Sequence, residues 1–399
     1  MTTDAYIYDW LRSPIGRYAG GLAGVRPDDL ASQVVRPLVE RLPFPLATYE
    51  DIVIGNTIQT GEGSRNIARF VGLLSGLPVE VAGQTVNRLC GSGLAALVTA
   101  SQAIRAGEGS LFVCGGVESM SRAPFVLQKA DKPYSRVAEI VDTTAGVAFP
   151  NPAFVSGFGN DPMPATADNI GRELGIGREE SDAFALASQE KYERARSAGF
   201  HAAEIAAIAV RSGKTTVLVE QDEHPRPDTN LVSLTKLRPL SEGGVVTAGN
   251  ASGINDGAAA LVIGSRAMGE AYGAPPRARI VACAVGGVEP RLMGLGPVPA
   301  IGKALERARL RLADMDVIEI NEAFATQVLG CLSRLGLSAG DGRVNPNGGA
   351  IALGHPLGCS GARLALTAAH QLDVTGGRYA LVSLCIGIGQ GIAVVLERT

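Results

Sequence analysis

Short apolar segments bounded by glycine or turn residues alternate along the chain with longer segments whose apolar residues recur at helical spacing. The short segments are typical of buried strands, and the longer ones are typical of helices that cover a sheet. Candidate strands begin at Ala5, Asp51, Ser110, Ala258, Ala278, Asp316, Tyr379 and Gly391. The alternation of the two patterns predicts an α/β protein.

Two of the longer segments carry clear helix signals. Between Leu94 and Ile104 the apolar residues share one face, and Gly107 supplies a stop. The segment REESDAFALASQEKYERARSAG has Ser181 as a candidate N-cap and Gly199 as a stop. Both segments are expected to be helices.

One stretch of sequence occurs twice in related form. LCGSGLAALVTASQAI, which starts at Leu89, resembles LGCSGARLALTAAHQL, which starts at Leu357. Each copy follows a strand-like segment, DIVIGN or DVIEIN, and precedes a strand with a central cysteine. The repetition predicts two related halves.

The repeat suggests how the chain is divided. One half is expected to comprise residues 1–120 together with 248–272, and the other residues 273–399. Between the two parts of the first half, residues 121–247 mix aromatic, proline, glycine and charged residues irregularly. Long insertions in compact α/β folds often cover or bind a ligand, so an inserted loop domain is predicted here.

Composition and charge narrow the class of protein. The chain has 399 residues, 46% of them hydrophobic and 19% charged, as in a large soluble protein. With 36 Lys and Arg against 39 Asp and Glu, the net charge is -3 and no polybasic run is present, which disfavours nucleic-acid binding. Neither a signal peptide nor an apolar run of membrane-spanning length is recognised, so a cytoplasmic protein without membrane segments is expected.

The six cysteines are scattered, without a C-x-x-C pair, and do not suggest disulfides or a zinc site. Cys90 differs from the others because it precedes the glycine-rich start of a helix, where backbone N–H groups and the helix dipole would lower the thiol pKa. From this position alone, Cys90 is either a nucleophile or a small buried residue.

His355 is the most unusual of the four histidines, because it lies between Gly354 and Pro356. It is either a turn histidine bonded to backbone or a side chain with space for a ligand beside it. His201, His224 and His370 lie in charged or helix-like surroundings and are expected to be surface or incidental residues.

Two further segments contain candidate chemistry. In CIGIGQG, Cys385 precedes glycines that resemble a dinucleotide-binding loop, but too few residues follow for the helix and strand of such a unit. A tight turn that offers N–H groups to an oxyanion fits better. In INEAFA, Asn321 either positions a water molecule or caps a helix that begins at Glu322.

Five motifs together resemble those of thiolases: NRLCGSGLAA, AGNASGINDGAA, INEAFA, NPNGGAIALGHPLGCSGARL and CIGIGQG, in this order. The resemblance runs from YIYDWLRSPIG to GIAVVLE. It implies two mixed five-stranded halves in a five-layer αβαβα arrangement, with a loop domain inserted in the first half. It also implies a homo-oligomer, dimer or tetramer, that uses CoA and acyl-CoA as substrates and holds no permanently bound cofactor.

The resemblance also implies roles for individual residues. Cys90 would be the nucleophile that accepts the acyl group. His355 would activate it and would donate to a thioester oxyanion, together with a water held by Asn321. Cys385 would be the general acid and base, and the N–H groups of Cys90 and Gly387 would form a second oxyanion hole. The positions that match CoA-binding residues are Met163, Arg226, Ser233, Ala248, Ser252 and Phe324.

The inserted loop bears on the substrate. Biosynthetic acetoacetyl-CoA thiolases have histidine where this chain has Pro162, whereas SMSRAPFVLQKADKPYSRVAEIVDTTAGVAFPNP and GNDPMPATADNI resemble thiolases that cleave 3-oxoadipyl-CoA. Its terminal carboxylate needs a cation, for which Arg122, Lys129, Lys132 and Arg136 are candidates, and the alternative for each of them is a solvated surface charge. Acetoacetyl-CoA or medium-chain thiolase activity is the alternative. A ketoacyl synthase would lack the second cysteine, and a non-catalytic acyl-CoA-binding relative would lack a catalytic residue.

Overall fold

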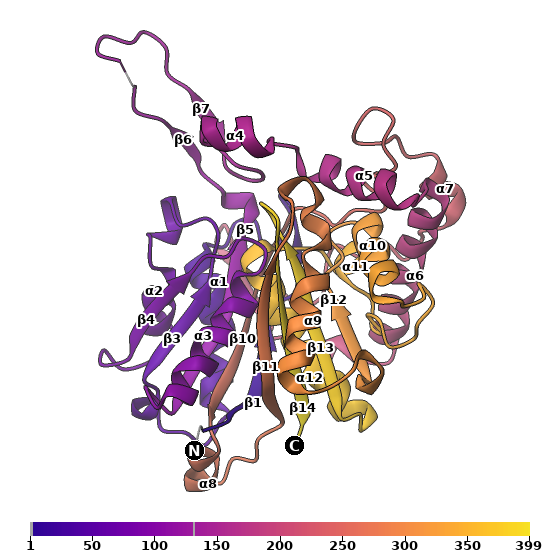
Figure 1. The fold of residues 1–399 in the computed structure, drawn as a ribbon. Helices are drawn as coiled ribbons and strands as arrows, with labels where there is room; N and C mark the ends of the chain where they lie inside the picture. The colour runs from indigo at the N-terminus through magenta and orange to yellow at the C-terminus, as the bar shows by residue number, and fades with distance from the viewer. Residues whose placement is uncertain (1–2, 131) are drawn as a thin grey trace.

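The computed structural model describes residues 3–130 and 132–399 as one long twisted sheet with helices on its faces (Figure 1). All the candidate strands named from the sequence are present. The strands are β1 (Ala5–Arg12), β2 (Gly16–Arg17), β3 (Asp51–Gly55), β4 (Ala82–Val86), β5 (Leu111–Ser119), β6 (Phe125–Leu127), β7 (Ile140–Asp142), β8 (Ile208–Ser212), β9 (Thr215–Val219), β10 (Asn255–Ser265), β11 (Ala278–Gly287), β12 (Val317–Ile320), β13 (Tyr379–Ile386) and β14 (Gln390–Arg398).

The main sheet consists of two parts with mixed strand directions. Its order is β12-β13-β14-β11-β1-β10-β5-β3-β4, and the two parts join where β1 pairs with β11 at Tyr6 and Ile7 alone. The first part contains β4, β3, β5, β10 and β1. In the second part, a single bridge between Ile318 and Val344 stands where a fifth strand is expected. The chain leaves the extended conformation immediately afterwards, at Asn345, whose φ is 43°.

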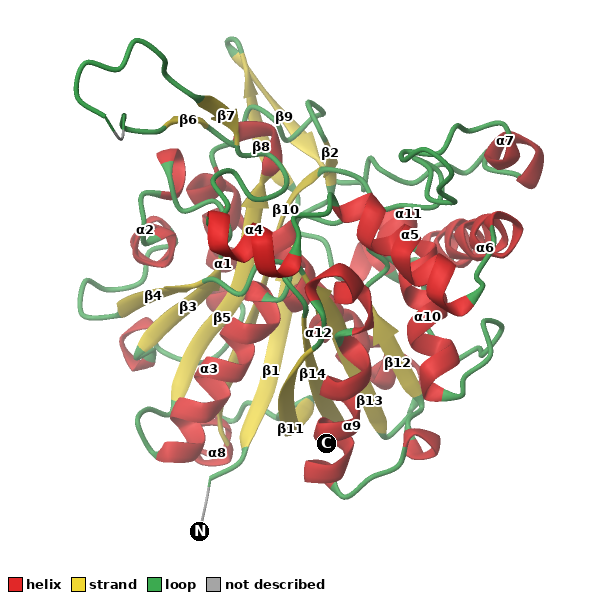
Figure 2. Ribbon diagram, turned by 45° about the horizontal axis from the view of Figure 1, so that its top comes forward, coloured by secondary structure: helices red, strands yellow, loops and turns green. Residues whose placement is uncertain are grey.

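Helices cover both outer faces of the sheet and also fill the space between its two parts (Figure 2). The helices are α1 (Pro27–Glu40), α2 (Ile67–Leu74), α3 (Ser92–Ala106), α4 (Pro152–Phe158), α5 (Met163–Leu174), α6 (Arg178–Ser197), α7 (Leu231–Thr235), α8 (Arg266–Tyr272), α9 (Pro297–Ala308), α10 (Ala325–Leu335), α11 (Ala350–Leu353) and α12 (Leu357–Thr375). None of the helices formed by the described residues has the length and hydropathy needed to cross a membrane.

Alternate residues of the strands face different cores, which defines the layers. In β13, Val382 and Leu384 pack against α3 and α12 in the central core, whereas Leu381 packs in the outer core with α9 and α10. The outer face of the first part is covered by α1 and α2. The layers therefore follow the order helix, sheet, helix, sheet, helix, as expected for the αβαβα arrangement.

The two central helices contact each other backbone to backbone near their N-termini. A Cβ on Gly93 of α3 would lie 2.5 Å from the carbonyl oxygen of Gly358, and a Cβ on Gly361 of α12 would overlap the backbone nitrogen of Leu94. Glycine is required because any side chain would push the helices apart. The loops that precede α3 and α12 are thereby held at the same place, where the two halves meet.

The two helix predictions have different outcomes. Helix α3 ends before Gly107, whose φ is 78°, as expected. For α6, Ser181 was the wrong cap, because the helix begins at Arg178 with Gly177 as its N-cap. The Ser181 hydroxyl lies within the helix and donates to the Gly177 carbonyl at 2.8 Å. The stop at Gly199, with φ 79°, is confirmed.

A buried polar network connects the segment after α6 to strand β1 and helix α12. Arg12 of β1 pairs with Glu204 at 2.9 Å and with Asp222 at 2.7 Å, and the Nδ1 of His370 in α12 lies 3.3 Å from Glu204. His201 and His370 are only 2% and 9% exposed, so the expectation that they lie at the surface was wrong. Their polar partners come from distant parts of the chain, which a local pattern of charges does not reveal.

Candidate active site

Cys90 lies in a tight loop between β4 and α3. The preceding residue, Leu89, has a φ of 48°, a left-handed conformation that costs free energy for a side chain of this size. The Ser92 hydroxyl stabilises the loop, because it accepts from the backbone N–H of Arg88 at 2.8 Å and donates to the carbonyl of Leu89 at 2.6 Å. The loop therefore presents the Cys90 thiol in a fixed orientation.

The electrostatic surroundings of Cys90 differ from the expectation. Burial raises the pKa of its thiol to about 11, although the backbone N–H groups of Gly387 and of Cys90 itself act in the opposite direction. The carboxylate of Glu118 raises the pKa further. The prediction of a lowered pKa from the helix start was wrong, because desolvation outweighs the helix dipole. At neutral pH the thiol is protonated, and a base must remove its proton.

Cys385 lies near the end of β13, beside Cys90. Burial raises its pKa well above the usual value, and the nearby Cys90 sulfur adds to this shift. The chain then turns through Ile388 and Gly389, with φ of 65° and 79°, and enters β14. This is the tight turn expected after Cys385, and it brings the Gly387 N–H to the Cys90 sulfur.

His355 lies between α11 and α12 and is 5% exposed. Its Nδ1 is 2.6 Å from the Ser360 hydroxyl, which donates its own hydrogen to the Pro356 carbonyl at 2.8 Å. Ser360 must therefore accept from Nδ1–H, so Nε2 is left unprotonated. Burial, with a contribution from Arg363, lowers the pKa of His355 to about 3, and the ring is neutral at pH 7.

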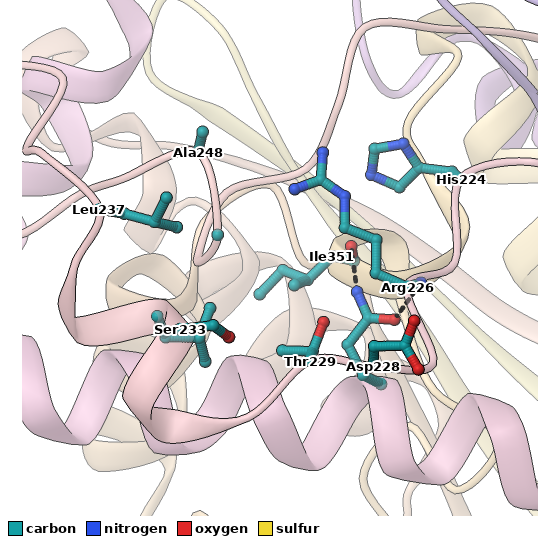
Figure 3. A pocket seen from close by; sticks show the side chains of 11 residues that line it. His224, Arg226, Asp228, Thr229, Ser233, Leu237, Ala248 and Ile351 are labelled. Carbon is teal, nitrogen blue, oxygen red and sulfur yellow. Dashed lines mark hydrogen bonds between the residues drawn. The ribbon is translucent and has the colours of Figure 1, made fainter.

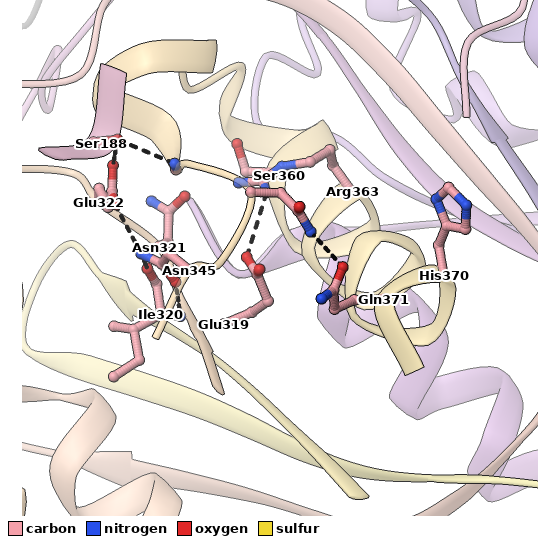
Figure 4. Close-up of polar contacts among 12 residues, drawn as sticks. Ser188, Glu319, Ile320, Asn321, Glu322, Asn345, Ser360, Arg363, His370 and Gln371 are labelled. Atoms are coloured by element: carbon pink, nitrogen blue, oxygen red, sulfur yellow. Dashed lines mark hydrogen bonds and ion pairs between the residues drawn. The ribbon is translucent and has the colours of Figure 1, made fainter. Parts of the chain in front are cut away.

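Asn321 follows β12 and lies among buried polar side chains that include Glu322 and Asn345 (Figure 4). Its Nδ2 is 3.5 Å from Nδ1 and 3.4 Å from Nε2 of the His355 imidazole. It does not cap a helix, because α10 begins at Ala325 with Phe324 as its N-cap. Among the described residues no group donates to the buried Oδ1 of Asn321. The amide therefore has a free acceptor beside the imidazole, which suits a water molecule or a ligand.

Two important groups were missed in the sequence. Ser360 holds His355 as Ser92 holds the Cys90 loop, and the two serines occupy equivalent positions in the internal repeat. Glu118 is fully buried in β5 and accepts from Thr57, Ile58 and the backbone of α12 at Gly358, which is 2.9 Å away. A charged residue in the otherwise apolar segment LFVCGGVES was the available signal.

Three of the six proposed CoA-binding residues line one open cavity of about 380 Å³ (Figure 3). They are Arg226, Ser233 and Ala248, and Ile351 from the C-terminal half lines it too. The side chain of Gln189 in α6 forms hydrogen bonds with two residues that line the cavity. It accepts from the backbone N–H of Arg226 at 3.0 Å and donates to the carbonyl of Ile351 at 3.4 Å.

His224 also lines this cavity, although it was expected to be an incidental surface residue. Burial, with a smaller contribution from the Arg226 charge, lowers the pKa of His224 to about 4. Its position two residues before Arg226 was the signal that could have placed it here. The His224 imidazole is therefore neutral at pH 7 and contributes a polar, uncharged group to the lining of the cavity.

The other three proposed residues lie at the reaction centre. Met163 and Phe324 belong to the same apolar cluster as Cys385, and a Cβ on Gly387 would lie 4.0 Å from the Met163 sulfur. The backbone N–H of Ser252 donates to the Ala323 carbonyl at 2.9 Å, beside Phe324. The six residues thus form an outer and an inner group.

The four cations proposed for a substrate carboxylate are not at the reaction centre. Arg122 is already bound to Glu62 through two hydrogen bonds of 2.5 Å. Lys129, Lys132 and Arg136 lie along the arm that contains β6 and β7 and projects from the body of the molecule (Figure 1). The expectation that one of them binds the acyl group within this chain is therefore corrected.

The chain is similar to known proteins over its whole length. The family models "Thiolase, N-terminal domain" and "Thiolase, C-terminal domain" match residues 5–267 and 274–398. The 3-oxoadipyl-CoA/3-oxo-5,6-dehydrosuberyl-CoA thiolase of Escherichia coli is 56% identical over 398 residues, 99% of each chain. The acetyl-CoA acetyltransferase of Bacillus anthracis superposes with a TM-score of 0.94 at 37% identity, covering 100% of this chain and 99% of that one.

A second solved structure, the human mitochondrial 3-ketoacyl-CoA thiolase in complex with CoA, has a TM-score of 0.91 and 40% identity, covering 100% of this chain and 98% of that one. The resemblance seen in the five motifs is therefore confirmed over the whole chain. Both family domains match in order, so the chain belongs to the thiolase family and has the thiolase fold.

Proposed function

We propose that this acyltransferase cleaves 3-oxoadipyl-CoA with CoA, giving acetyl-CoA and succinyl-CoA, and that it also catalyses the reverse condensation. The observation that carries the proposal is the meeting of two cysteines from different halves, Cys90 and Cys385, beside the N–H of Gly387. The substrate follows from the inserted loop and from the full-length relative that is named for 3-oxoadipyl-CoA.

In the first step, Nε2 of His355 takes the proton of Cys90, and the thiolate attacks the 3-oxo carbon. The N–H groups of Cys90 and Gly387 stabilise the resulting oxyanion. The bond between carbons 2 and 3 then breaks, and its electron pair forms the enolate of acetyl-CoA. Cys385 protonates that enolate, while Nε2–H of His355 and a water on Asn321 stabilise its oxygen.

In the second step, CoA releases the acyl group. Cys385, now a thiolate, takes the proton of the CoA thiol, and the CoA sulfur attacks the thioester carbonyl on Cys90. The tetrahedral oxyanion again lies between the N–H groups of Cys90 and Gly387. Cys90 leaves as a thiolate and recovers its proton from His355, which restores the starting state.

Coenzyme A would bind across the outer and inner groups of residues. The cavity with Arg226, Ser233 and Ala248 suits the nucleotide end, whereas Met163, Ser252 and Phe324 suit the pantetheine end near Cys90. In this proposal CoA is a substrate and no cofactor is held permanently. Residues 121–247 would form the loop domain that covers it, inserted between 1–120 and 248–272, with 273–399 as the second half.

The protein is proposed to act as a cytoplasmic homo-oligomer. Strand β4 is a partly exposed edge of the main sheet, which invites pairing with a second chain. The side chains of Phe125, Leu127 and Ile140 on the projecting arm are 73%, 59% and 65% exposed. An exposed apolar surface of this kind is typical of a site of contact between protein chains. Both surfaces support a dimer or a tetramer.

A side-by-side assay tests the proposed substrate. CoA-dependent cleavage of 3-oxoadipyl-CoA is expected to show a kcat/KM about tenfold or more above those for acetoacetyl-CoA and a medium-chain 3-oxoacyl-CoA, because one well-placed interaction with a charged group gives such a ratio. Higher kcat/KM for either uncharged substrate would favour the corresponding alternative thiolase activity.

The hydrogen bond between Ser360 and His355 leads to a second prediction. Ser360→Ala is expected to lower kcat on the order of 10–100-fold, because the imidazole loses the acceptor that keeps Nε2 unprotonated. In the unaltered enzyme the His355 pKa of about 3 predicts no protonation of this base between pH 5 and 8 in a kcat/KM profile.

Two variants separate this effect from lost stability. Ser360→Thr keeps the hydroxyl and should retain most activity. Ser101→Ala removes a similarly buried hydroxyl from α3 and should leave kcat unchanged. Full activity in Ser360→Ala would show that Ser360 does not set the tautomer.

A further inference from the structure

A small cavity opens beside the candidate reaction centre and shares no lining residue with the CoA cavity. Its volume is about 40 Å³, and its walls include Met163, Ile388, Phe154 and Phe158. Met163 packs in the cluster of Cys385, and Ile388 directly follows Gly387. Two walls of the cavity are thus shared with the site where the acyl group is bound to Cys90.

The cavity has one cationic side chain among the residues that line it, Arg291. Its backbone is fixed at the start of the 3-10 helix Pro290–Leu295, and its carbonyl accepts from Asn169 at 3.1 Å. No carboxylate of the described residues lies within ion-pair distance of its guanidinium. Arg291 differs in this respect from Arg122, whose guanidinium already forms an ion pair with Glu62.

The acidic residue of the cavity is already engaged elsewhere. Asp161 accepts from the side-chain amide of Asn169 at 2.8 Å and forms no ion pair with Arg291. The same amide nitrogen donates to the backbone carbonyl of Arg291, so Asn169 links the two residues without using the Arg291 guanidinium. An incoming carboxylate would therefore meet a guanidinium that has both of its outer N–H groups to offer.

The acyl group that remains on Cys90 is short and ends in a carboxylate. After cleavage of 3-oxoadipyl-CoA, the group on Cys90 is a succinyl group, whose three C–C bonds of about 1.5 Å place the carboxylate carbon about 4 Å from the thioester carbonyl. The carboxylate would meet the guanidinium at the rim of this cavity, where Phe158, Ile388 and Arg291 are exposed to solvent. A guanidinium binds it through two parallel hydrogen bonds.

We propose that Arg291 binds the terminal carboxylate of the acyl group and so selects dicarboxylic 3-oxoacyl-CoA substrates. The proposal rests on the function proposed above and adds the residue that carries its specificity. In this proposal the cavity lined by Met163, Ile388 and Arg291 binds the carboxylate end of the acyl group that is attached to Cys90. An acyl chain with a terminal methyl group makes no use of the Arg291 charge.

The test compares 3-oxoadipyl-CoA with 3-oxohexanoyl-CoA, which has the same chain length and a methyl group in place of the carboxylate. Arg291→Gln is expected to lower kcat/KM for 3-oxoadipyl-CoA by about 10–100-fold, since one charged hydrogen-bond pair is lost, and to leave 3-oxohexanoyl-CoA little changed. Arg291→Lys keeps the positive charge but lacks the planar guanidinium. Its kcat/KM for 3-oxoadipyl-CoA should therefore lie between the values for the unaltered enzyme and for Arg291→Gln. Arg211→Gln, an exposed arginine on β8, should change neither substrate.

The two substrates separate the possible failures. If the unaltered enzyme prefers 3-oxoadipyl-CoA and Arg291→Gln keeps that preference, or loses activity equally on both substrates, Arg291 is not the selecting residue while the proposed function stands. If the unaltered enzyme itself does not prefer 3-oxoadipyl-CoA, the proposed function fails and this inference fails with it.

Discussion

Cys90→Ala is expected to abolish acyl transfer, lowering kcat/KM by roughly 10⁵–10⁶-fold, as the loss of a covalent nucleophile does in other enzymes. The reaction then has no thiolate to form the acyl intermediate, although the N–H groups of Cys90 and Gly387 remain in place. Intact-protein mass spectrometry after incubation with 3-oxoadipyl-CoA should show the acyl adduct on the unaltered protein and none on the variant.

A second cysteine provides the matched control. Cys283 is also partly exposed and has a pKa that burial raises to about 11, as for Cys90. Cys283→Ala should keep the adduct and the turnover. An adduct of normal stoichiometry on the Cys90 variant would mean that another residue is the nucleophile.

Cys385→Ala is expected to separate the two halves of the reaction. Acylation of Cys90 by an acyl-CoA should continue slowly, whereas C–C bond turnover should fall by about 10²–10⁴-fold, because no group remains to move the proton at carbon 2. In heavy water, the methyl hydrogens of acetyl-CoA are replaced by deuterium, and NMR can monitor this exchange. The exchange rate measures that proton transfer directly.

The control for this variant is Cys331→Ala, which removes a buried thiol close enough to influence the pKa of Cys385. It should retain exchange and turnover. Exchange at the normal rate in Cys385→Ala would assign the acid and base role to another group.

The strands could be predicted because each is formed by a short apolar segment that is bounded in the sequence by turn residues. The boundary of β10 moved because buried polar side chains at its start have distant partners. Strand β10 begins at Asn255, before the apolar segment from Ala258. Asn255 and Asp256 are fully buried because they bond to His355 and Ser121, which no local pattern indicates.

The candidate reactive residues were proposed from their motifs, but the direction of the pKa shift of Cys90 was predicted wrongly. The pKa of Cys90 depends on how deeply the folded chain covers it, and the helix start alone indicates the opposite direction. Arg291 had no sequence signal at all. It is one of 36 basic residues, and only the cavity formed with Met163 and Ile388 distinguishes it.

The glycine contact between α3 and α12 also bears on how the family could diversify. Because two backbones touch at Gly93 and Gly358, the spacing of Cys90 and His355 does not depend on any side chain that could be exchanged or change rotamer. The walls around Arg291 instead come from residues 147–166, the segment after β11 and the single residue Ile388. New acyl preferences can therefore arise by substitution in those walls while the spacing of the reactive pair is inherited unchanged.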